Sequence, residues 1–178
     1  GSGALMRSGP NGVEVASPAR AAATMNERFQ MSLDTNQYFT MIYGILDKES
    51  MQFQFIRAGH PPLVVVRASG QVEAVTDICG PAVGILPSVE YEEAVVQLEP
   101  GDHIILFTDG VDESTNLAGE EFGLERIMAA LTTTHTTTVA ESVRTLRATV
   151  EQFSTGKAQA DDITIVGFGV RSEVPAFL

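Results

Sequence analysis

The stretch FTDGVDES, residues 107–114, places three carboxylates around a glycine directly after an apolar run. That run, residues 103–108, is typical of a buried strand, so Asp109 stands where the strand ends. Asp112 and Glu113 complete an acidic group within five residues. Three interpretations are open from these residues alone: a polar turn, a solvated loop, or a site for a hard cation, which prefers oxygen ligands.

A second acidic position, Asp161 and Asp162, lies directly before the apolar run ITIVGF, which predicts a closing strand. A strand holds its end rigidly, so a carboxylate there is pre-placed for binding. If the closing strand lies antiparallel to 103–108, Asp109 and Asp161 can meet. Like charges that close are unfavourable without a cation between them, so Mg²⁺ or Mn²⁺ is one prediction. The alternative is that Asp and Gly form turns for backbone reasons alone.

In the rest of the chain, the spacing of apolar residues indicates which segments are helices and which are strands. Ser17 and Pro18 predict a helix start, followed by apolar residues at helical spacing as far as Leu33. The residues GALMRS, 3–8, resemble the frayed end of another helix. Thr138 with Glu141 predicts a capping box for a later helix. Strands are expected at 39–47, 51–58, 62–68, 69–75, 92–98, 103–108 and 161–170, and helices at 17–33, 122–131 and 138–153.

This order predicts an α+β fold, mainly antiparallel sheets packed with helices. We expect one domain at 17–170, a tag remnant and flexible start at 1–16, and a tail at 171–178. His103 is expected at the surface.

Composition narrows the functional classes. The chain has 178 residues, 11 basic and 23 acidic, a formal net charge of −12, which argues against nucleic-acid binding. No apolar run is long enough for a membrane span, and no secretory signal is visible, so a cytoplasmic location is expected. The single cysteine, Cys79, excludes an internal disulfide and a cysteine-based zinc site.

Several segments together resemble one family. They are SPARAAATMNERF, FTMIYGILD, FIRAGHPPLVV, GPAVGILP, LEPGDHIILFTDGVDES, EEFGLERI and ADDITIVGF. In this order and spacing they resemble the SpoIIE-type, RsbU-like branch of the metal-dependent (PPM) protein serine/threonine phosphatases. The resemblance implies an α-β-β-α sandwich and a hydrolase that acts on phosphoserine or phosphothreonine, such as that of an anti-sigma-factor antagonist.

The resemblance also implies roles for individual residues. Asp109 and Asp161 are the expected ligands of a two-metal Mn²⁺ or Mg²⁺ centre, where a metal-activated water attacks the phosphate. Gly110 is expected to allow a close approach of the chain, and Asp162 and Glu113 are candidates for supporting the ligands. His60, in AGHPP, is the remaining candidate, as a proton donor or a hydrogen-bonding group between strands.

Two family motifs, GDxxD and DVxGHG, are absent from this sequence. In the family the first supplies the aspartate that bridges the metals, so this chain is expected to hold one ion or none, with weak or no activity. Loss of the strands that carry these motifs exposes sheet edges, which predicts a homodimer. The alternatives are a pseudophosphatase that binds a regulatory partner and a β-rich module with a structural Ca²⁺.

Overall fold

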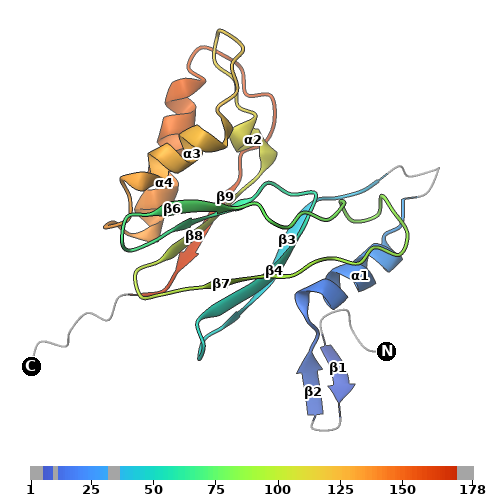
Figure 1. Cartoon of the computed structure of the whole chain (residues 1–178). Coiled ribbons are helices and arrows are strands. Elements are labelled where there is room, and N and C mark those ends of the chain that lie inside the picture. Colours follow the sequence, from blue (N-terminus) through green and yellow to red (C-terminus); the bar gives the residue numbers. More distant parts are fainter. Residues whose placement is uncertain (1–5, 10–11, 32–36, 172–178) are drawn as a thin grey trace, which may run out of the picture. The chain divides into compact units, whose positions relative to one another are not determined.

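The computed structural model describes residues 6–9, 12–31 and 37–171 and confirms the α+β class (Figure 1). The chain forms two compact units, one from residues 1–60 and 77–97 and the other from residues 61–76 and 98–178. No helix within the described residues has the length and apolar character of a membrane-spanning segment.

The first unit holds a three-stranded antiparallel sheet in the order β3-β4-β7. Its strands are β3 (Met41–Asp47), β4 (Gln52–Ala58) and β7 (Ala94–Gln97). The β3–β4 hairpin is in the predicted place, because Phe53 and Phe55 bury one face of β4 while its Gln residues alternate with them.

Helix α1 (Pro18–Arg28) packs on this sheet and begins as predicted, with Ser17 as its N-cap. It ends earlier than the apolar spacing suggested, since Phe29 already leaves the helical conformation, and Leu33 lies outside the described residues. The expected frayed helix at 3–8 is wrong for its described part. Strands β1 (Met6–Gly9) and β2 (Gly12–Val15) form an antiparallel hairpin there.

The second unit holds a four-stranded antiparallel sheet in the order β6-β5-β8-β9. The strands are β5 (Leu63–Val66), β6 (Val72–Val75), β8 (His103–Phe107) and β9 (Ile165–Gly169). Strand β9 is shorter than the expected 161–170. Strands β7 and β8, joined by the turn EPGD, belong to different sheets and do not pair with each other.

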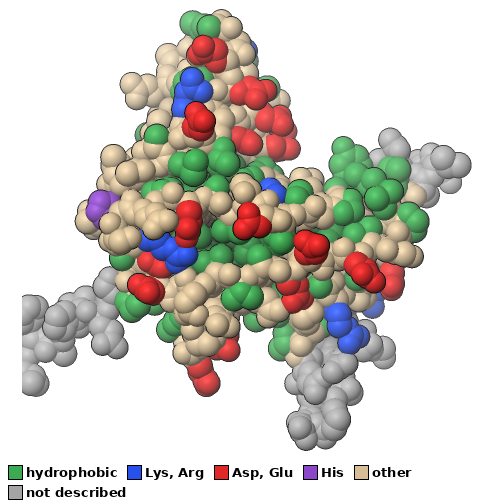
Figure 2. Space-filling model, in the orientation of Figure 1, with side chains coloured by type: hydrophobic (Ala, Val, Ile, Leu, Met, Phe, Trp, Pro, Cys, Tyr) green, Lys and Arg blue, Asp and Glu red, His purple; other side chains and the backbone are tan. Residues whose placement is uncertain are grey.

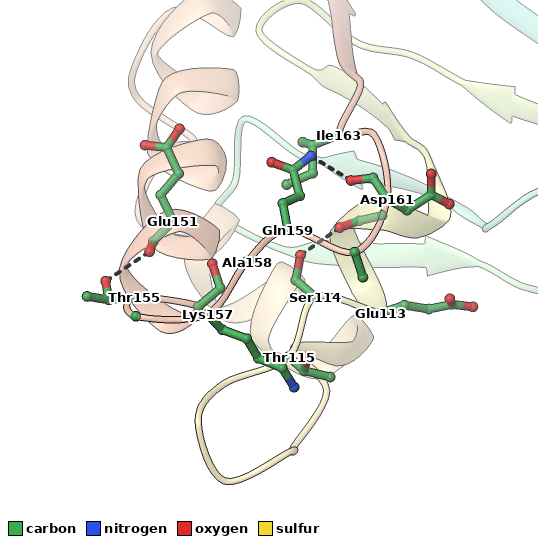
Figure 3. Close-up of a pocket in the computed structure, with 14 residues that line it drawn as sticks. Glu113, Ser114, Thr115, Glu151, Thr155, Lys157, Ala158, Gln159, Asp161 and Ile163 are labelled. Carbon is green, nitrogen blue, oxygen red and sulfur yellow. Dashed lines mark hydrogen bonds between the residues drawn. The ribbon is translucent and has the colours of Figure 1, made fainter.

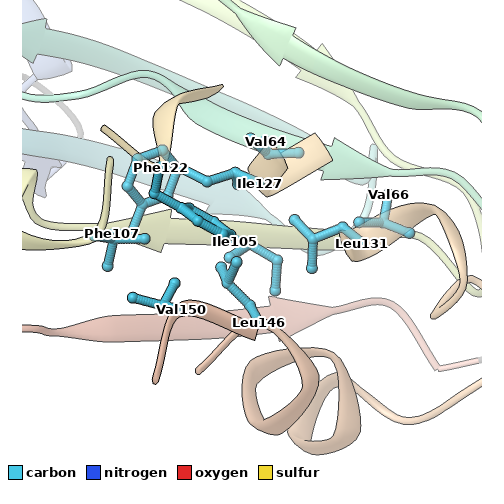
Figure 4. Packing of buried hydrophobic residues seen from close by; sticks show 10 residues of the cluster. Val64, Val66, Ile105, Phe107, Phe122, Ile127, Leu131, Leu146 and Val150 are labelled. Carbon is cyan, nitrogen blue, oxygen red and sulfur yellow. The ribbon is translucent and has the colours of Figure 1, made fainter. Parts of the chain in front are cut away.

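Three helices complete the second unit: α2 (Asp109–Asp112), α3 (Gly123–Thr132) and α4 (Val139–Phe153). The capping box of α4 is present as predicted, since Thr138 and Glu141 exchange both bonds. Side chains from the sheet and from α3 and α4 interdigitate in one buried cluster (Figure 4). Its members are Val64, Val66, Ile105, Phe107, Val111, Phe122, Ile127, Leu131, Leu146 and Val150.

A buried carboxylate fixes the start of β8. Asp102 is 2% exposed, and its oxygens accept hydrogen bonds from Arg67 Nη1 at 2.9 Å and from the backbone N–H groups of Ala68 and Glu99 at 2.9 and 3.0 Å. Three donors compensate the cost of burying the charge. Burial alone would lower the pKa of Arg67, but its bonds with Asp102 and Glu73 outweigh that effect and raise it.

His103, the next residue, corrects a prediction. It is buried, not at the surface, and its Nδ1 lies 3.3 Å from the Ser142 Oγ on α4. Burial lowers the pKa of its imidazole. The prediction was wrong because the polar turn EPGD directly before His103 suggested an exposed position, whereas the His103 side chain faces α4.

We expect Asp102→Ala to lower the free energy of unfolding by about 3 kcal/mol, because it removes a buried charge partner and leaves two backbone donors unpaired. Urea denaturation measures the change. The matched control is Glu73→Ala, which removes the more exposed partner of the same arginine and should cost about 1 kcal/mol or less. Equal effects of the two substitutions would contradict this account.

Candidate functional site

The antiparallel pairing of β8 with β9 brings the two acidic segments together. Its register runs from His103 opposite Gly169 to Phe107 opposite Ile165, so the end of β8 lies beside the start of β9. The closing strand thus lies beside β8 and antiparallel to it, which is the condition under which Asp109 and Asp161 were predicted to meet. The residues that follow β8 and those that precede β9 therefore share one edge of the sheet.

Thr108 extends this pairing beyond the last strand residues. Its backbone N–H donates to the Thr164 carbonyl at 3.1 Å. Its hydroxyl accepts from the Thr164 N–H and donates to the Asp162 carbonyl, both at 3.0 Å. These contacts of Thr108 with Asp162 and Thr164, the clamp of Thr108, were not predicted from the sequence, although a hydroxyl residue directly before the Asp-Gly pair was a signal for them.

Gly110 lies directly against the segment that the clamp holds. It is buried, and a Cβ added to it would lie 2.5 Å from the Asp162 carbonyl oxygen and 3.4 Å from the Asp161 carbonyl carbon. Any larger residue would push the two segments apart. The backbones at 109–110 and 161–162 are thus in contact because residue 110 has no side chain.

The two candidate ligands, Asp109 and Asp161, are both exposed on these segments. Asp109 Oδ1 accepts a hydrogen bond from the Gly110 N–H at 3.0 Å, and Asp161 Oδ1 accepts one from the Asp162 N–H at 2.7 Å. Each carboxylate is therefore oriented by the backbone that follows it. That the two side chains share one ion stays a prediction.

The carboxylate oxygens of Asp109 and Asp161 are the type of ligand that a hard divalent cation prefers, but there are too few of them to fill its coordination shell. Carboxylate oxygens suit Mg²⁺ and Mn²⁺, which commonly take about six ligands. Among the described residues, however, no group of three or more His, Cys, Asp or Glu side chains could hold a metal ion. The part of the chain that the structure describes therefore supplies fewer ligands than such an ion commonly takes.

Asp112 is the carboxylate of the acidic stretch with a buried, unpaired oxygen. Its Oδ1 is buried and has no hydrogen-bond partner within the described part of the chain. Burial raises its pKa, and the nearby charges of Glu113, Asp109 and Glu121 raise it further, against a lowering hydrogen bond with its own N–H. The site edge therefore carries a carboxyl group that favours its protonated form more than a free aspartate does.

A cavity of about 270 Å³ opens beside Asp161 and Gly110 (Figure 3). The end of α4 and the loop that follows it form one side, and the residues after α2 form the other. Ser114 Oγ donates to the Gly110 carbonyl at 2.6 Å, and Gln159 Nε2 donates to the Asp161 carbonyl at 2.5 Å. In Figure 3 the Asp161 and Glu113 carboxylates point away from the other lining residues, which include the charged residues Glu151 and Lys157 as well as hydroxyl and amide groups.

The remaining candidates have different positions. Asp162 joins the site through its carbonyl oxygen, which accepts from Thr108, and its side chain is exposed. Glu113 ends α2 and donates its N–H to the Asp109 carbonyl at 2.9 Å. His60 belongs to the first unit, while all the others belong to the second. Supporting roles for Asp162, Glu113 and His60 stay predictions.

Comparison with known proteins gives a family and a fold. The model of the family "Stage II sporulation protein E (SpoIIE)" matches residues 4–171. Protein IcfG of Synechocystis sp. is 28% identical over 133 residues, which cover 75% of this chain and 21% of that protein. Phosphoserine phosphatase RsbU of Bacillus subtilis is 28% identical over 96 residues, 54% of this chain and 29% of that protein. The chain thus spans less than a third of either relative.

Solved structures share the fold. The SiaA-PP2C domain of Pseudomonas aeruginosa has a TM-score of 0.73 at 22% identity, covering 86% of this chain and 61% of that one. The PP2C phosphatase domain of SpoIIE from Bacillus subtilis, solved with a fragment of its regulatory domain, has a TM-score of 0.72 at 22% identity. The match covers 86% of this chain and 44% of that one.

We expect Gly110→Ala to lower the free energy of unfolding by about 1–3 kcal/mol and to shift the amide resonances of residues 161–164, because the added methyl collides with the Asp162 carbonyl. Urea denaturation and amide NMR spectra measure both effects. Gly169→Ala is the matched control: its added Cβ would lie 2.5 Å from the Asp102 carbonyl oxygen, at the other end of the same strand pair. It should destabilise the chain but leave the resonances of 161–164 in place.

The raised pKa of Asp112 predicts a pH dependence of stability. Because the folded state binds this proton more tightly than the unfolded state, the contribution is favourable below the ordinary carboxyl pKa and is lost as pH rises through the raised folded value. Asp112→Asn should therefore raise the melting temperature at pH 7 by roughly 1–3 °C, with little gain at pH 4. Thermal melts across this range test it; a gain that is equal at both pH values would rule out the assigned cause.

Proposed function

The chain belongs to the family of Stage II sporulation protein E (SpoIIE), and from that premise we propose that it is part of a metal-dependent protein serine/threonine phosphatase domain. One observation carries the proposal. The clamp of Thr108 and the close approach at Gly110 hold the backbone next to Asp109 against the backbone next to Asp161. The two proposed ligands, Asp109 and Asp161, therefore lie on segments that meet at one edge of the sheet.

The proposed substrate is a phosphoserine or phosphothreonine of a regulatory protein, such as an anti-sigma-factor antagonist, in the cytoplasm. Two relatives named phosphoserine phosphatases, RsbU and RsbP of Bacillus subtilis, support the substrate class. Their names describe those proteins, of which this chain spans 29% and 22%.

We assign Asp109 and Asp161 as ligands of Mn²⁺ or Mg²⁺. The bound ion would supply the Lewis-acid chemistry that activates water toward a phosphate ester. A solved SpoIIE phosphatase domain of the same fold is described as presoaked in Mn, which supports the choice of metal. In this proposal the N–H groups of Gly110 and Asp162 orient the Asp109 and Asp161 carboxylates, and Gly110 leaves room for the Asp162 carbonyl. Asp162 and Glu113 are proposed to support the two segments through their backbone hydrogen bonds.

A second candidate function is a pseudophosphatase that binds a regulatory partner without hydrolysis. The shortage of ligands favours it, since no metal-binding group of three occurs among the described residues. For the chain by itself we therefore expect weak activity or none. The two functions differ in whether the addition of GDxxD and DVxGHG segments restores hydrolysis.

Hydrolysis of p-nitrophenyl phosphate and of a phosphoserine peptide, with and without Mn²⁺, distinguishes the two functions. We expect this chain to be nearly inactive and a longer chain that carries both motifs to hydrolyse both substrates only with the metal. Asp109→Asn and Asp161→Asn in the longer chain should each reduce kcat/KM about 100-fold or more, because even outer-shell partners of a metal cost 10- to 100-fold.

The control is Glu125→Gln, which changes an exposed carboxylate in the first turn of α3 and should leave kcat/KM unchanged. Line broadening by paramagnetic Mn²⁺ supplies a readout without turnover. The amide resonances of residues 109–110 and 161–162 should broaden in this chain. The broadening should be smaller in Asp161→Asn and as large as in the unchanged chain in Glu125→Gln. An inactive longer chain without such broadening would favour the pseudophosphatase.

A further inference from the structure

The cavity beside Asp161 and Gly110 is attached on two sides to the segments that carry the candidate ligands. On one wall Ser114 Oγ donates to the Gly110 carbonyl at 2.6 Å, and on the other Gln159 Nε2 donates to the Asp161 carbonyl at 2.5 Å. All the lining residues belong to the second unit. A group bound in this cavity would therefore lie beside the backbone that holds Asp161.

Lys157 is the only cationic side chain among the residues that line this cavity, all of which the structure describes. It follows α4, and its side chain extends toward the residues after α2 (Figure 3). Within the described part of the chain its ammonium group takes part in no ion pair or hydrogen bond. The Glu151 carboxylate, which also lines the cavity, accepts a hydrogen bond from Arg147 Nε at 2.7 Å. The charge of Glu151 is thus compensated, and that of Lys157 is not.

The turn after α4 fixes the backbone of Lys157. The Lys157 N–H donates to the Ser154 carbonyl at 3.0 Å, and Gly156 has a φ of 85°, which favours glycine. A Cβ added to Gly156 would lie 3.5 Å from Leu117 Cδ1, in ordinary contact, so the turn packs against the segment that follows α2. The Lys157 side chain therefore starts from a held position between the two walls.

The hydrogen-bond donors of the cavity are suited to a carboxylate. The Lys157 ammonium and the Thr115 hydroxyl donate to no group among the described residues, and Gln159 uses only one amide N–H for Asp161. An ammonium group forms shorter and stronger hydrogen bonds with a carboxylate than with a neutral acceptor. The other hydroxyl groups of the lining donate to backbone carbonyls and present oxygen atoms to a ligand: Ser114, Ser154 and Thr155.

The size of the cavity and the direction of Asp161 indicate which part of a substrate it would take. Its volume of about 270 Å³ is below the roughly 300–1,000 Å³ of small-molecule sites, so it suits one side chain. In Figure 3 the Asp161 carboxylate points away from the other lining residues. A phosphate held by an ion at that carboxylate would therefore lie outside the cavity, and a neighbouring residue of the substrate would enter it.

The surroundings of Lys157 are acidic. Asp109, Glu113, Asp161 and Asp162 are all exposed, and Figure 2 shows acidic side chains gathered beside α2. A phosphoprotein brings further negative charge to this edge, which these carboxylates repel. A preference for an acidic substrate would therefore depend on Lys157, and removal of this one cation should abolish it.

We propose that the cavity binds an acidic side chain, aspartate or glutamate, next to the phosphoserine or phosphothreonine of the substrate protein, and that Lys157 determines this specificity. The inference rests on the proposed function for its substrate. The contact itself requires no hydrolysis, so it would also serve a pseudophosphatase. An ion pair between Lys157 and the carboxylate, supported by Thr115 and Gln159, selects the phosphorylated segment by its sequence.

Hydrolysis of two phosphoserine peptides tests the preference in the longer chain with GDxxD and DVxGHG. The peptides differ only in having glutamates or lysines beside the phosphoserine. We expect a kcat/KM about fivefold higher for the glutamate peptide, the effect of one partly exposed ion pair. Lys157→Gln should abolish the preference and Lys157→Glu should invert it, which a merely structural role would not do. Lys48→Gln, at the other lysine of the chain, in the exposed β3–β4 turn, is the matched control and should retain the preference.

Amide NMR spectra of the present chain give a readout without metal or turnover. Millimolar glutamate peptide should shift the resonances of residues 154–160 more than the lysine peptide does, and Lys157→Gln should remove the difference. Equal shifts with both peptides, or no shift at 154–160 with either, would overturn the inference, as would hydrolysis without a preference. The selective shifts together with an inactive longer chain would instead count against the proposed phosphatase and leave the inference in place.

Discussion

The pairing of β8 with β9 is the contact on which the candidate site depends. Their register places side by side two segments that are more than 50 residues apart in sequence. The Thr108 hydroxyl extends this contact through its hydrogen bonds with Asp162 and Thr164. The first acidic segment forms only the short helix α2, and the single cysteine of the chain means that no internal disulfide holds either segment. A ladder of backbone hydrogen bonds fixes their distance. At one end it is extended by the Thr108 hydroxyl, and at the other by the hydrogen bond from the Val170 N–H to the Asp102 carbonyl.

The buried carboxylate of Asp102 and the half-buried carboxylate of Asp112 show how the surroundings decide the effect of a charge on stability. Asp102 has three donors and stabilises the start of a strand. Asp112 has a buried oxygen without a partner and lies among other acids. Folded proteins retain such a group at a cost in stability, and they do so chiefly at functional edges. Asp112 lies three residues after Asp109, at the same edge of the sheet as the candidate ligands.

Local patterns predicted much of the fold. The alternation of Phe53 and Phe55 with glutamines, and the capping box of Thr138 and Glu141, each gave an element in its correct place. The β1–β2 hairpin and the short helix α2 were not foreseen, because four-residue elements have too few positions to establish a period. For the site, the opposed strands could be foreseen. For the clamp of Thr108, the sequence offered a hydroxyl residue before the Asp-Gly pair but not its partners, because Asp162 and Thr164 reach Thr108 only through the register of β8 and β9.

The two compact units alternate along the chain, which passes between them at residues 60–61, 76–77 and 97–98. Neither unit is a continuous stretch of polypeptide. On the ribosome, the β5–β6 hairpin of the second unit is therefore synthesised before β7 completes the sheet of the first. Deletion of one continuous segment can therefore remove neither unit cleanly, and synthesis of the second unit begins before the chain of the first is complete.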